Sequence, residues 1–211
     1  MDRSSQLRVD TELSSPSKVR LSAWLNAGWD VFMEDPGSFL IIGLVAVALL
    51  AFTHGLLWGP VMLGLAAVGV RRVRMGRVEV ADFFQGFRYF LPAVLAGLLV
   101  LVFSVIGLAF LIVPGVVVFS MYLFTFHFIF DQEQDFWEGM ESSRKLVARD
   151  YFGFALFALI LLGINFLGLA FLLIGTILTV PVTALAMTAA YLDIIEGPPA
   201  PSPDSKPVMI E

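Results

Sequence analysis

Hydrophobic residues dominate three long stretches of the chain, residues 36–70, 89–130 and 151–192, and none of the three contains Asp, Glu, Lys or Arg. An α-helix rises about 1.5 Å per residue, so about 20 residues cross a hydrocarbon core that is about 30 Å thick. Each stretch is therefore long enough to cross a membrane twice. The pattern predicts an all-α polytopic membrane protein with six transmembrane helices, arranged as three hairpins.

Gly and Pro residues interrupt each stretch near its middle, and they end or kink helices because Pro lacks an N–H and Gly is conformationally loose. The interruptions are Gly59-Pro60, Val113-Pro114-Gly115, and Gly175 followed by Pro181. They predict spans at 39–57 and 60–74, 91–112 and 115–130, and 152–173 and 176–192. The span 60–74 is short, which leaves open a first hairpin that does not fully cross the bilayer.

An amphipathic segment precedes each predicted hairpin, at residues 17–34, 79–90 and 135–149. In the first segment, apolar residues recur at helical spacing, at Leu21, Leu25, Trp29, Phe32 and Met33. We expect these helices to lie in the lipid headgroup layer. The alternative is that they pack beneath the bundle as cytoplasmic core. The unit of a surface helix and a hairpin would repeat three times, although any six-span chain with short outer turns looks periodic.

Folding the three stretches into hairpins places every charged segment on one side of the membrane. The segments are 1–35, 71–88, 131–150 and 193–211, and they hold all 13 Lys and Arg residues. Positive residues near span ends mark the cytoplasmic side. The cluster that follows the second span, Arg71, Arg72, Arg74 and Arg77, is the strongest such signal. We therefore expect a multi-pass membrane protein with both termini in the cytoplasm.

The same four arginines are candidates for contact with anionic lipid headgroups, at about 1 kcal/mol for each arginine near the surface. The plainer interpretation is that they only set the topology. An acidic run follows the fourth predicted span, at Asp131, Glu133, Asp135, Glu138 and Glu141. Its spacing does not match an EF-hand, and we expect a solvated face.

The composition adds few chemical possibilities. The chain is 58% hydrophobic and 15% charged, its mean hydropathy is +0.87, its net charge is −5, and it has no Cys. This composition excludes thiolate chemistry and argues against nucleic-acid binding. Residues 1–16 are predicted to be a disordered tail without the apolar core of a signal peptide. Residues 17–196 form the membrane domain, and the Pro-rich residues 197–211 a second disordered tail.

Three polar residues stand out within or beside the spans: His54, His127 and Asn165. His54 is expected at an outer turn and His127 at an inner helix end, so the two cannot share a metal ion. Asn165 lies near the middle of the fifth span, where an amide should bond to a neighbouring helix. The spans hold no charged residue, which argues against a proton-coupled pump. We expect no catalytic, cofactor or metal site.

Several short motifs resemble those of a large, poorly characterised class of bacterial integral membrane proteins. The class is also similar to the membrane region of membrane-anchored glycerophosphoryl diester phosphodiesterases. The resemblance covers roughly residues 20–195. It implies a six-helix fold in the bacterial inner membrane, without a catalytic residue to transfer. The matching residues are Gly59-Pro60, Asp82-Phe83-Phe84-Gln85-Gly86-Phe87, Ile112-Val113-Pro114-Gly115, Asp131, Pro181 and Ala190-Tyr191.

Two functions remain open at this point. The first is a non-enzymatic protein that organises the membrane, interacts with lipid or acts as a scaffold. Its partners would be the bilayer, anionic lipids, and a second copy or another membrane protein, but not nucleic acid. The alternative is a transporter or channel for a small or lipidic solute. A path for that solute would be lined by Asn165, Ser104, Ser120 and Thr179.

Overall fold

The computed structural model describes residues 19–110, 112–171 and 174–197, and within these ranges every regular element is helical. The two predicted tails lie outside the described residues, apart from Gly197. The elements are α2 (Leu21–Glu34), α3 (Pro36–Phe52), α4 (Trp58–Met75), α5 (Val80–Phe83), the 3-10 helix η1 (Phe84–Tyr89), α6 (Phe90–Phe110), α7 (Ile112–Met121), α8 (Thr125–Asp131), α9 (Phe136–Val147), α10 (Tyr151–Ala170) and α11 (Ile174–Ile195).

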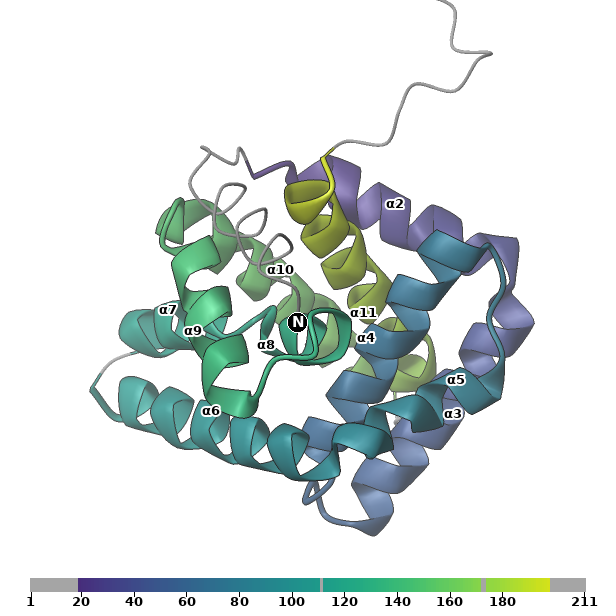
Figure 1. Ribbon diagram of the computed structural model, residues 1–211, viewed down its shortest axis with the longest axis horizontal. Coiled ribbons are helices and arrows are strands. Elements are labelled where there is room, and N and C mark those ends of the chain that lie inside the picture. Colours follow the sequence, from purple (N-terminus) through teal and green to yellow (C-terminus); the bar gives the residue numbers. More distant parts are fainter. Residues whose placement is uncertain (1–18, 111, 172–173, 198–211) are drawn as a thin grey trace, which may run out of the picture.

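The helices pack into one bundle in which α11 is the central helix, in contact with α2, α3, α4 and α10 (Figure 1). Among the described residues, three helical stretches are long and apolar enough to cross a membrane: Val80–Gly107, Tyr151–Ala170 and Ile174–Ile195. A fourth is counted if α2 and α3, which meet at a bend of 104°, form one broken span. These helices indicate a multi-pass membrane protein.

The remaining predicted spans are shorter or more polar than those three. Helix α3 has 17 residues, and the apolar segment Gly115–Asp131 is also short. Helix α4 has 18 residues, but Arg71, Arg72 and Arg74 occupy its last turns. Length and hydrophobicity therefore identify three or four spans, and the full count of six depends on the topology proposed below.

The turn between the first two predicted spans comes before Gly59-Pro60, not at it. Helix α3 ends at Phe52, His54 and Gly55 have positive φ angles of 52° and 80°, and α4 begins at Trp58. Pro60 fits the first turn of α4 because the N–H groups of that turn have no partner within the helix. A Cβ atom on Gly59 would lie 2.0 Å from the carbonyl oxygen of Ala93, so Gly59 permits close contact between α4 and α6.

The fourth predicted span, 115–130, is divided into α7 and α8 by a turn at residues 122–124. Ser143 of α9 bonds to both sides of this turn. Its Oγ accepts a hydrogen bond of 3.1 Å from the N–H of Phe124 and donates one of 2.8 Å to the carbonyl of Met121. Non-helical backbone inside a bundle needs such substitute partners. The predicted break at 113–115 lies within the first turns of α7, and residue 111 is outside the described ranges.

The third hairpin follows the prediction closely, with α10 and α11 near 152–173 and 176–192. Gly175 lies in the first turn of α11, where an added Cβ would come within 2.4 Å of the carbonyl oxygen of Gly168. Pro181 lies inside α11 and is buried. Gly168 and Gly175 therefore permit close contact between the two helices.

Two of the three predicted surface segments, α2 and α9, form helices that pack one face against the bundle. Helix α2 buries Trp24, Gly28 and Phe32 and leaves Trp29 and Met33 about half exposed, so its inner face is rotated from the predicted one. Helix α9 lies within the predicted segment 135–149 and buries Met140, Ser143 and Val147 at helical spacing. The segment 79–90 is not one amphipathic helix but the short α5 followed by η1, which continue into α6.

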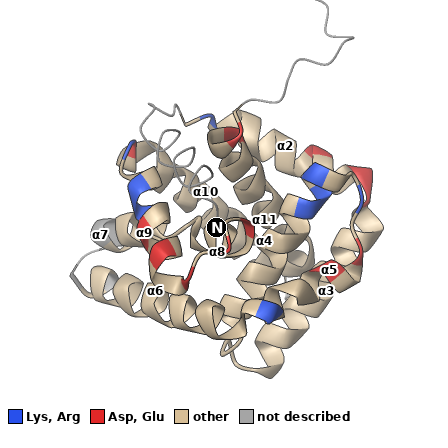
Figure 2. Ribbon diagram, in the orientation of Figure 1, with Lys and Arg blue, Asp and Glu red and all other residues tan. Residues whose placement is uncertain are grey.

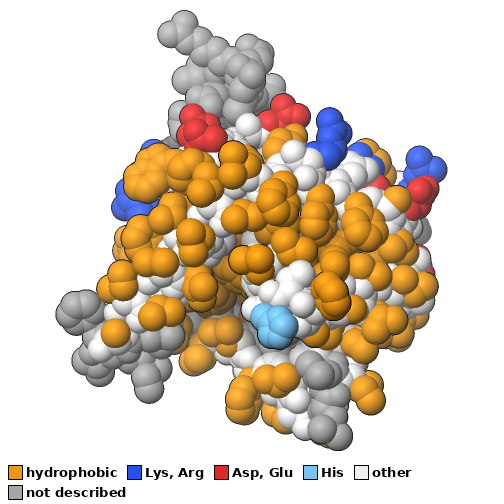
Figure 3. Space-filling view, turned by 90° about the horizontal axis from the view of Figure 1, so that it is seen from below, with side chains coloured by type: hydrophobic (Ala, Val, Ile, Leu, Met, Phe, Trp, Pro, Cys, Tyr) orange, Lys and Arg blue, Asp and Glu red, His pale blue; other side chains and the backbone are white. Residues whose placement is uncertain are grey.

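Charged side chains gather on one side of the molecule. Figure 2 shows the charged residues at helix ends and on α9, with long uncharged stretches of α6, α10 and α11 between them. Figure 3 shows the charged side chains visible from below along the upper edge of that view, with a broad hydrophobic face beneath them. The surface thus has the division that the charge pattern predicts for a chain with one cytoplasmic side.

Candidate functional site

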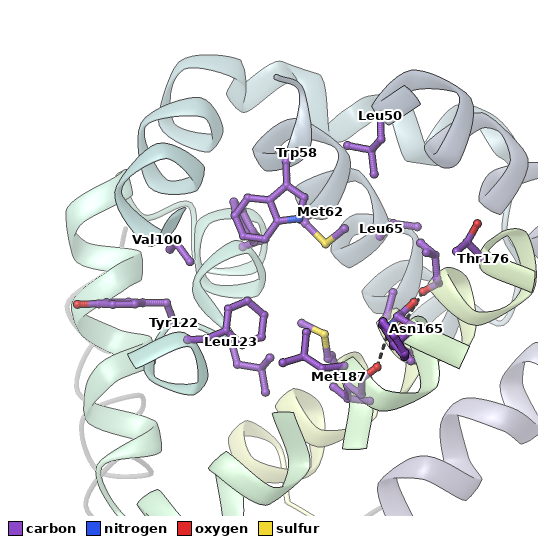
Figure 4. Close-up of a pocket in the computed structure, with 18 of the residues that line it drawn as sticks. Leu50, Trp58, Met62, Leu65, Val100, Tyr122, Leu123, Asn165, Thr176 and Met187 are labelled. Carbon is purple, nitrogen blue, oxygen red and sulfur yellow. Dashed lines mark hydrogen bonds between the residues drawn. The ribbon is translucent and has the colours of Figure 1, made fainter. Parts of the chain in front are cut away.

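A cavity of about 470 Å³ lies inside the bundle, between α3, α4, α6, α7, α8, α10 and α11. This volume is within the range of about 300–1,000 Å³ that is typical of small-molecule sites. Its wall is mainly apolar, and Figure 4 shows Trp58, Met62, Leu123 and Met187 around the open space, with Asn165 to one side. Of the described residues that line it, none is charged.

Asn165 is the main polar group in the wall of this cavity. Its Nδ2 donates hydrogen bonds to the carbonyl of Leu161 (3.0 Å) and to Oγ1 of Thr183 on α11 (2.9 Å) (Figure 4). The Thr183 hydroxyl in turn donates to the carbonyl of Thr179 (2.8 Å). Both amide protons are thus used, and Oδ1 is buried without a partner among the described residues. The amide links α10 to α11 and leaves one unused acceptor.

The cavity reaches the outer surface of the bundle along α10. Leu162, Phe166 and Leu169 line the cavity and are also 42%, 72% and 53% exposed. An exposed apolar helix face of this kind is expected to contact lipid hydrocarbon. An apolar molecule could therefore pass between the bilayer and the cavity without meeting a charged group.

A second cavity of about 360 Å³ adjoins the first beside the turn between α3 and α4. Trp58, Val100 and Phe119 line both cavities. The second also contains two polar residues, His54 and Ser104, and the Oγ of Ser104 is buried without a hydrogen-bond partner in the part of the chain that is described. The first cavity is therefore mainly apolar, and the second cavity, which adjoins it, is more polar.

The two histidines lie in different environments. His54 is exposed in the turn after α3, whereas His127 is buried in α8, with Nε2 at 3.1 Å from Oγ1 of Thr188 and its ring centroid at 5.2 Å from that of Tyr191. No group of three or more His, Cys, Asp or Glu residues in the described ranges could hold a metal ion. His127 therefore belongs to the packing between α8 and α11.

Three of the four predicted lipid-contact arginines form ion pairs inside the protein. Arg71 pairs with Asp82 (2.7 Å) and Arg72 with Glu34 (2.7 Å). Arg74 pairs with Asp131 and with Glu196 (2.6 Å). Arg77 is exposed, and no ion pair joins it to another described residue. The cluster thus ties the end of α4 to α2, α5, α8 and the residue after α11, and Arg77 remains the most available for a headgroup.

Asp131 was expected on a solvated acidic face, and the structure corrects this. Its side chain is 2% exposed, it pairs with Arg74, and it accepts a hydrogen bond of 2.8 Å from the hydroxyl of Tyr191. The sequence held one usable signal, because Asp131 directly follows the long uncharged run 89–130, whereas the other acids of the cluster lie beyond that run. A buried carboxylate needs partners of this kind.

Of the four residues proposed for a solute path, two line the adjoining cavities. Asn165 lines the first cavity and Ser104 the second. Ser120 donates to the carbonyl of Val117, and Thr179 packs against Gly168; neither is among the described residues that line either cavity.

Comparison of the chain with protein-family models, curated proteins and solved structures gave no match.

Proposed function

We propose that this chain is a non-enzymatic, multi-pass protein of the bacterial inner membrane that holds the hydrocarbon chain of a membrane lipid in the cavity between α4, α6, α7, α10 and α11. The observation that carries the proposal is the cavity itself, which is apolar, lies in the range of ligand sites, and reaches the exposed face of α10 at Leu162, Phe166 and Leu169. Its walls consist mainly of apolar side chains with few hydrogen-bonding groups, which suits a hydrocarbon chain.

In the topology that we propose, the pairs α3 and α4, α6 and α7–α8, and α10 and α11 are three hairpins with both chain ends in the cytoplasm. The one-sided distribution of charge and the arginines at the end of α4 support this arrangement. The resemblance of the short motifs to bacterial six-helix membrane proteins agrees with it. The short α3 and α4 would cross with the help of arginine side chains that extend towards the headgroups.

Lipid binding at this cavity is compatible with a role in organising the membrane or other membrane proteins. Arg77 at the charged side is available to an anionic headgroup, and the exposed face of α6, with Leu98, Leu101 and Val105, is available to lipid, a second copy or another membrane protein. These partners are part of the proposal, and the cavity is its centre.

Trp58 provides a direct test, because it lines both cavities. The protein is reconstituted into nanodiscs of phosphatidylglycerol and phosphatidylcholine with brominated acyl chains, and tryptophan quenching is measured as the difference between the wild type and Trp58→Phe. We expect strong quenching of Trp58. Native mass spectrometry of the purified wild type should also show one retained lipid.

Ala184→Phe places a ring in the first cavity and should lower both signals, whereas the matched change Ala170→Phe on the exposed face of α10 should leave them unchanged. Two results together would refute the proposal: a wild type that carries no lipid, and quenching of Trp58 that Ala184→Phe does not alter.

Movement of a lipidic solute is a second candidate, favoured by the contact between the two cavities at Trp58, Val100 and Phe119. Its test is the transfer of a fluorescent lipid across proteoliposomes, read as the fraction accessible to external dithionite. Transport predicts a faster rise in that fraction than empty vesicles give, and a slower rise with Ala184→Phe. Equal rates with and without protein would leave lipid binding as the function.

A further inference from the structure

We infer that the bound lipid places its polar head in the second cavity, beside His54 and Ser104, and that this head carries hydrogen-bond acceptors directly after the acyl chain. This inference rests on the proposed function, since it assumes that a hydrocarbon chain occupies the first cavity. It adds the direction of the lipid and the class of head that the site accepts.

The direction follows from the position of the polar groups. The first cavity extends among α4, α8, α10 and α11. The described polar residues that line it are Tyr122, Asn165, Thr176 and Thr183, and the side chains of Asn165 and Thr183 bond to each other. The second cavity lies at the turn between α3 and α4, away from the arginines at the other end of α4. A lipid with its chain in the first cavity therefore has its head on the side opposite the charged face.

The class of head follows from what the second cavity offers. The Ser104 hydroxyl is buried without a partner among the described residues, and a buried hydroxyl is stabilised when it donates to an acceptor oxygen. A helical Ser usually bonds to a carbonyl one turn earlier, so the absence of a described partner for Ser104 sets it apart from Ser120, which donates to Val117.

His54 supplies a second donor at the same cavity. Its ring carries an N–H in every protonation state, and its φ of 52° lies in the left-handed region that non-Gly residues seldom adopt. Strained backbone of this kind is concentrated at functional sites. The residues that line this cavity include no Asp or Glu within the described ranges, so an oxygen-rich head meets donors and no carboxylate.

Acyl lipids fit this arrangement because their carboxylate or ester group directly follows the hydrocarbon chain. In the same way, the second cavity directly adjoins the first at Trp58. A plain hydrocarbon would fill the first cavity and leave the Ser104 hydroxyl without an acceptor. We therefore assign the site to an acyl lipid from the leaflet opposite the charged face.

The experiment compares two probes of equal chain length, dibrominated stearate and the corresponding dibrominated alkane, on the full chain in detergent micelles. Binding is measured as quenching of Trp58, again as the difference between the wild type and Trp58→Phe. We expect stearate to bind more tightly than the alkane. Ser104→Ala should weaken stearate binding roughly three- to tenfold, the range for one hydrogen bond, and leave alkane binding unchanged.

Two sets of controls separate the head from the general fold. Ser120→Ala removes a buried hydroxyl from the same hairpin. That hydroxyl bonds to its own helix, so the change should alter neither the affinity for stearate nor that for the alkane. His54→Asn keeps an N–H donor and tolerates the left-handed backbone, so it should retain stearate binding, whereas His54→Gly should weaken it.

The possible outcomes distinguish the two proposals. Equal binding of stearate and alkane, with no effect of Ser104→Ala beyond that of Ser120→Ala, would overturn the assignment of the head and leave the hydrocarbon site intact. Absence of Trp58 quenching by either probe would overturn both the hydrocarbon site and the assignment.

Discussion

The hydroxyl of Tyr191 in α11 donates a hydrogen bond of 2.8 Å to the carboxylate of Asp131 at the end of α8. Arg74, at the end of α4, binds the same carboxylate, so one buried acid joins three helices that are distant in sequence. The side chain of Asp131 is 2% exposed and Tyr191 is fully buried. This group of three residues fastens the charged side of the bundle.

Tyr191→Phe should destabilise the protein by about 1–3 kcal/mol, because a hydrogen bond to a buried charged acceptor is lost. The measurement is the free energy of unfolding in mixed detergent micelles. Tyr89→Phe is the matched control, since the Tyr89 hydroxyl makes only a 3.5 Å contact with Glu133 near the surface. Equal stability of the two variants would show that the bond to Asp131 contributes little.

Ser143→Ala should also destabilise the protein, by about 1–3 kcal/mol, because the N–H of Phe124 and the carbonyl of Met121 lose their partner inside the bundle. Hydrogen exchange at the amide of Phe124 should become faster than in the wild type. Ser142→Ala, one position earlier on α9 and half-buried, is the control. An unchanged exchange rate at Phe124 would contradict the role assigned to Ser143.

Gly28→Ala should separate α2 from α11, because an added Cβ would lie 2.5 Å from the backbone nitrogen of Ala186. The expected loss of stability is about 1–3 kcal/mol, as for other overpacked sites. Gly163→Ala adds the same methyl group to α10, where nothing lies within 4 Å, and should stabilise the helix by up to about 1 kcal/mol. The prediction fails if the two variants shift the unfolding midpoint in the same direction.

The proposed topology predicts opposite accessibility for the two ends of α4. Because the chain has no Cys, single-cysteine variants are free of background labelling. A membrane-impermeant maleimide added to intact cells should label Gly55→Cys in the outer turn, and it should label Arg77→Cys only after the membrane is opened. Labelling of both variants, or of neither, in intact cells would contradict a first hairpin that crosses the bilayer.

The charge pattern was sufficient to predict the helical class and the division of the surface into charged and apolar sides, and the Gly and Pro positions added the pair α10 and α11. The Gly and Pro positions misplaced the first turn, because Gly59-Pro60 is typical of a break but also suits the first turn of a helix in close contact with α6. Neither pattern could reveal the interruption at residues 122–124, whose backbone partner, Ser143, is supplied from a later helix.

The cavity lay beyond prediction for a similar reason. Its walls come from seven helices, and a residue such as Leu123 or Met187 reads equally well as packed core or as cavity lining. Asn165 was recognised as a polar residue at depth, and its bond to Thr183 is the interhelical contact that such an amide requires. The burial of the Asp131 side chain could not be predicted, because its partners Arg74 and Tyr191 are far from it in sequence.

In the proposed topology, the arginines of α4 would act at two stages. During insertion, before their acidic partners fold beside them, Arg71, Arg72 and Arg74 would be free positive charges that keep this end of the helix in the cytoplasm. After folding, each is matched by a carboxylate from another segment. The positive charge that would orient the helix is then neutralised by ion pairs within the protein. The surface of the folded protein at the end of α4 is therefore far less basic than the sequence of α4 indicates.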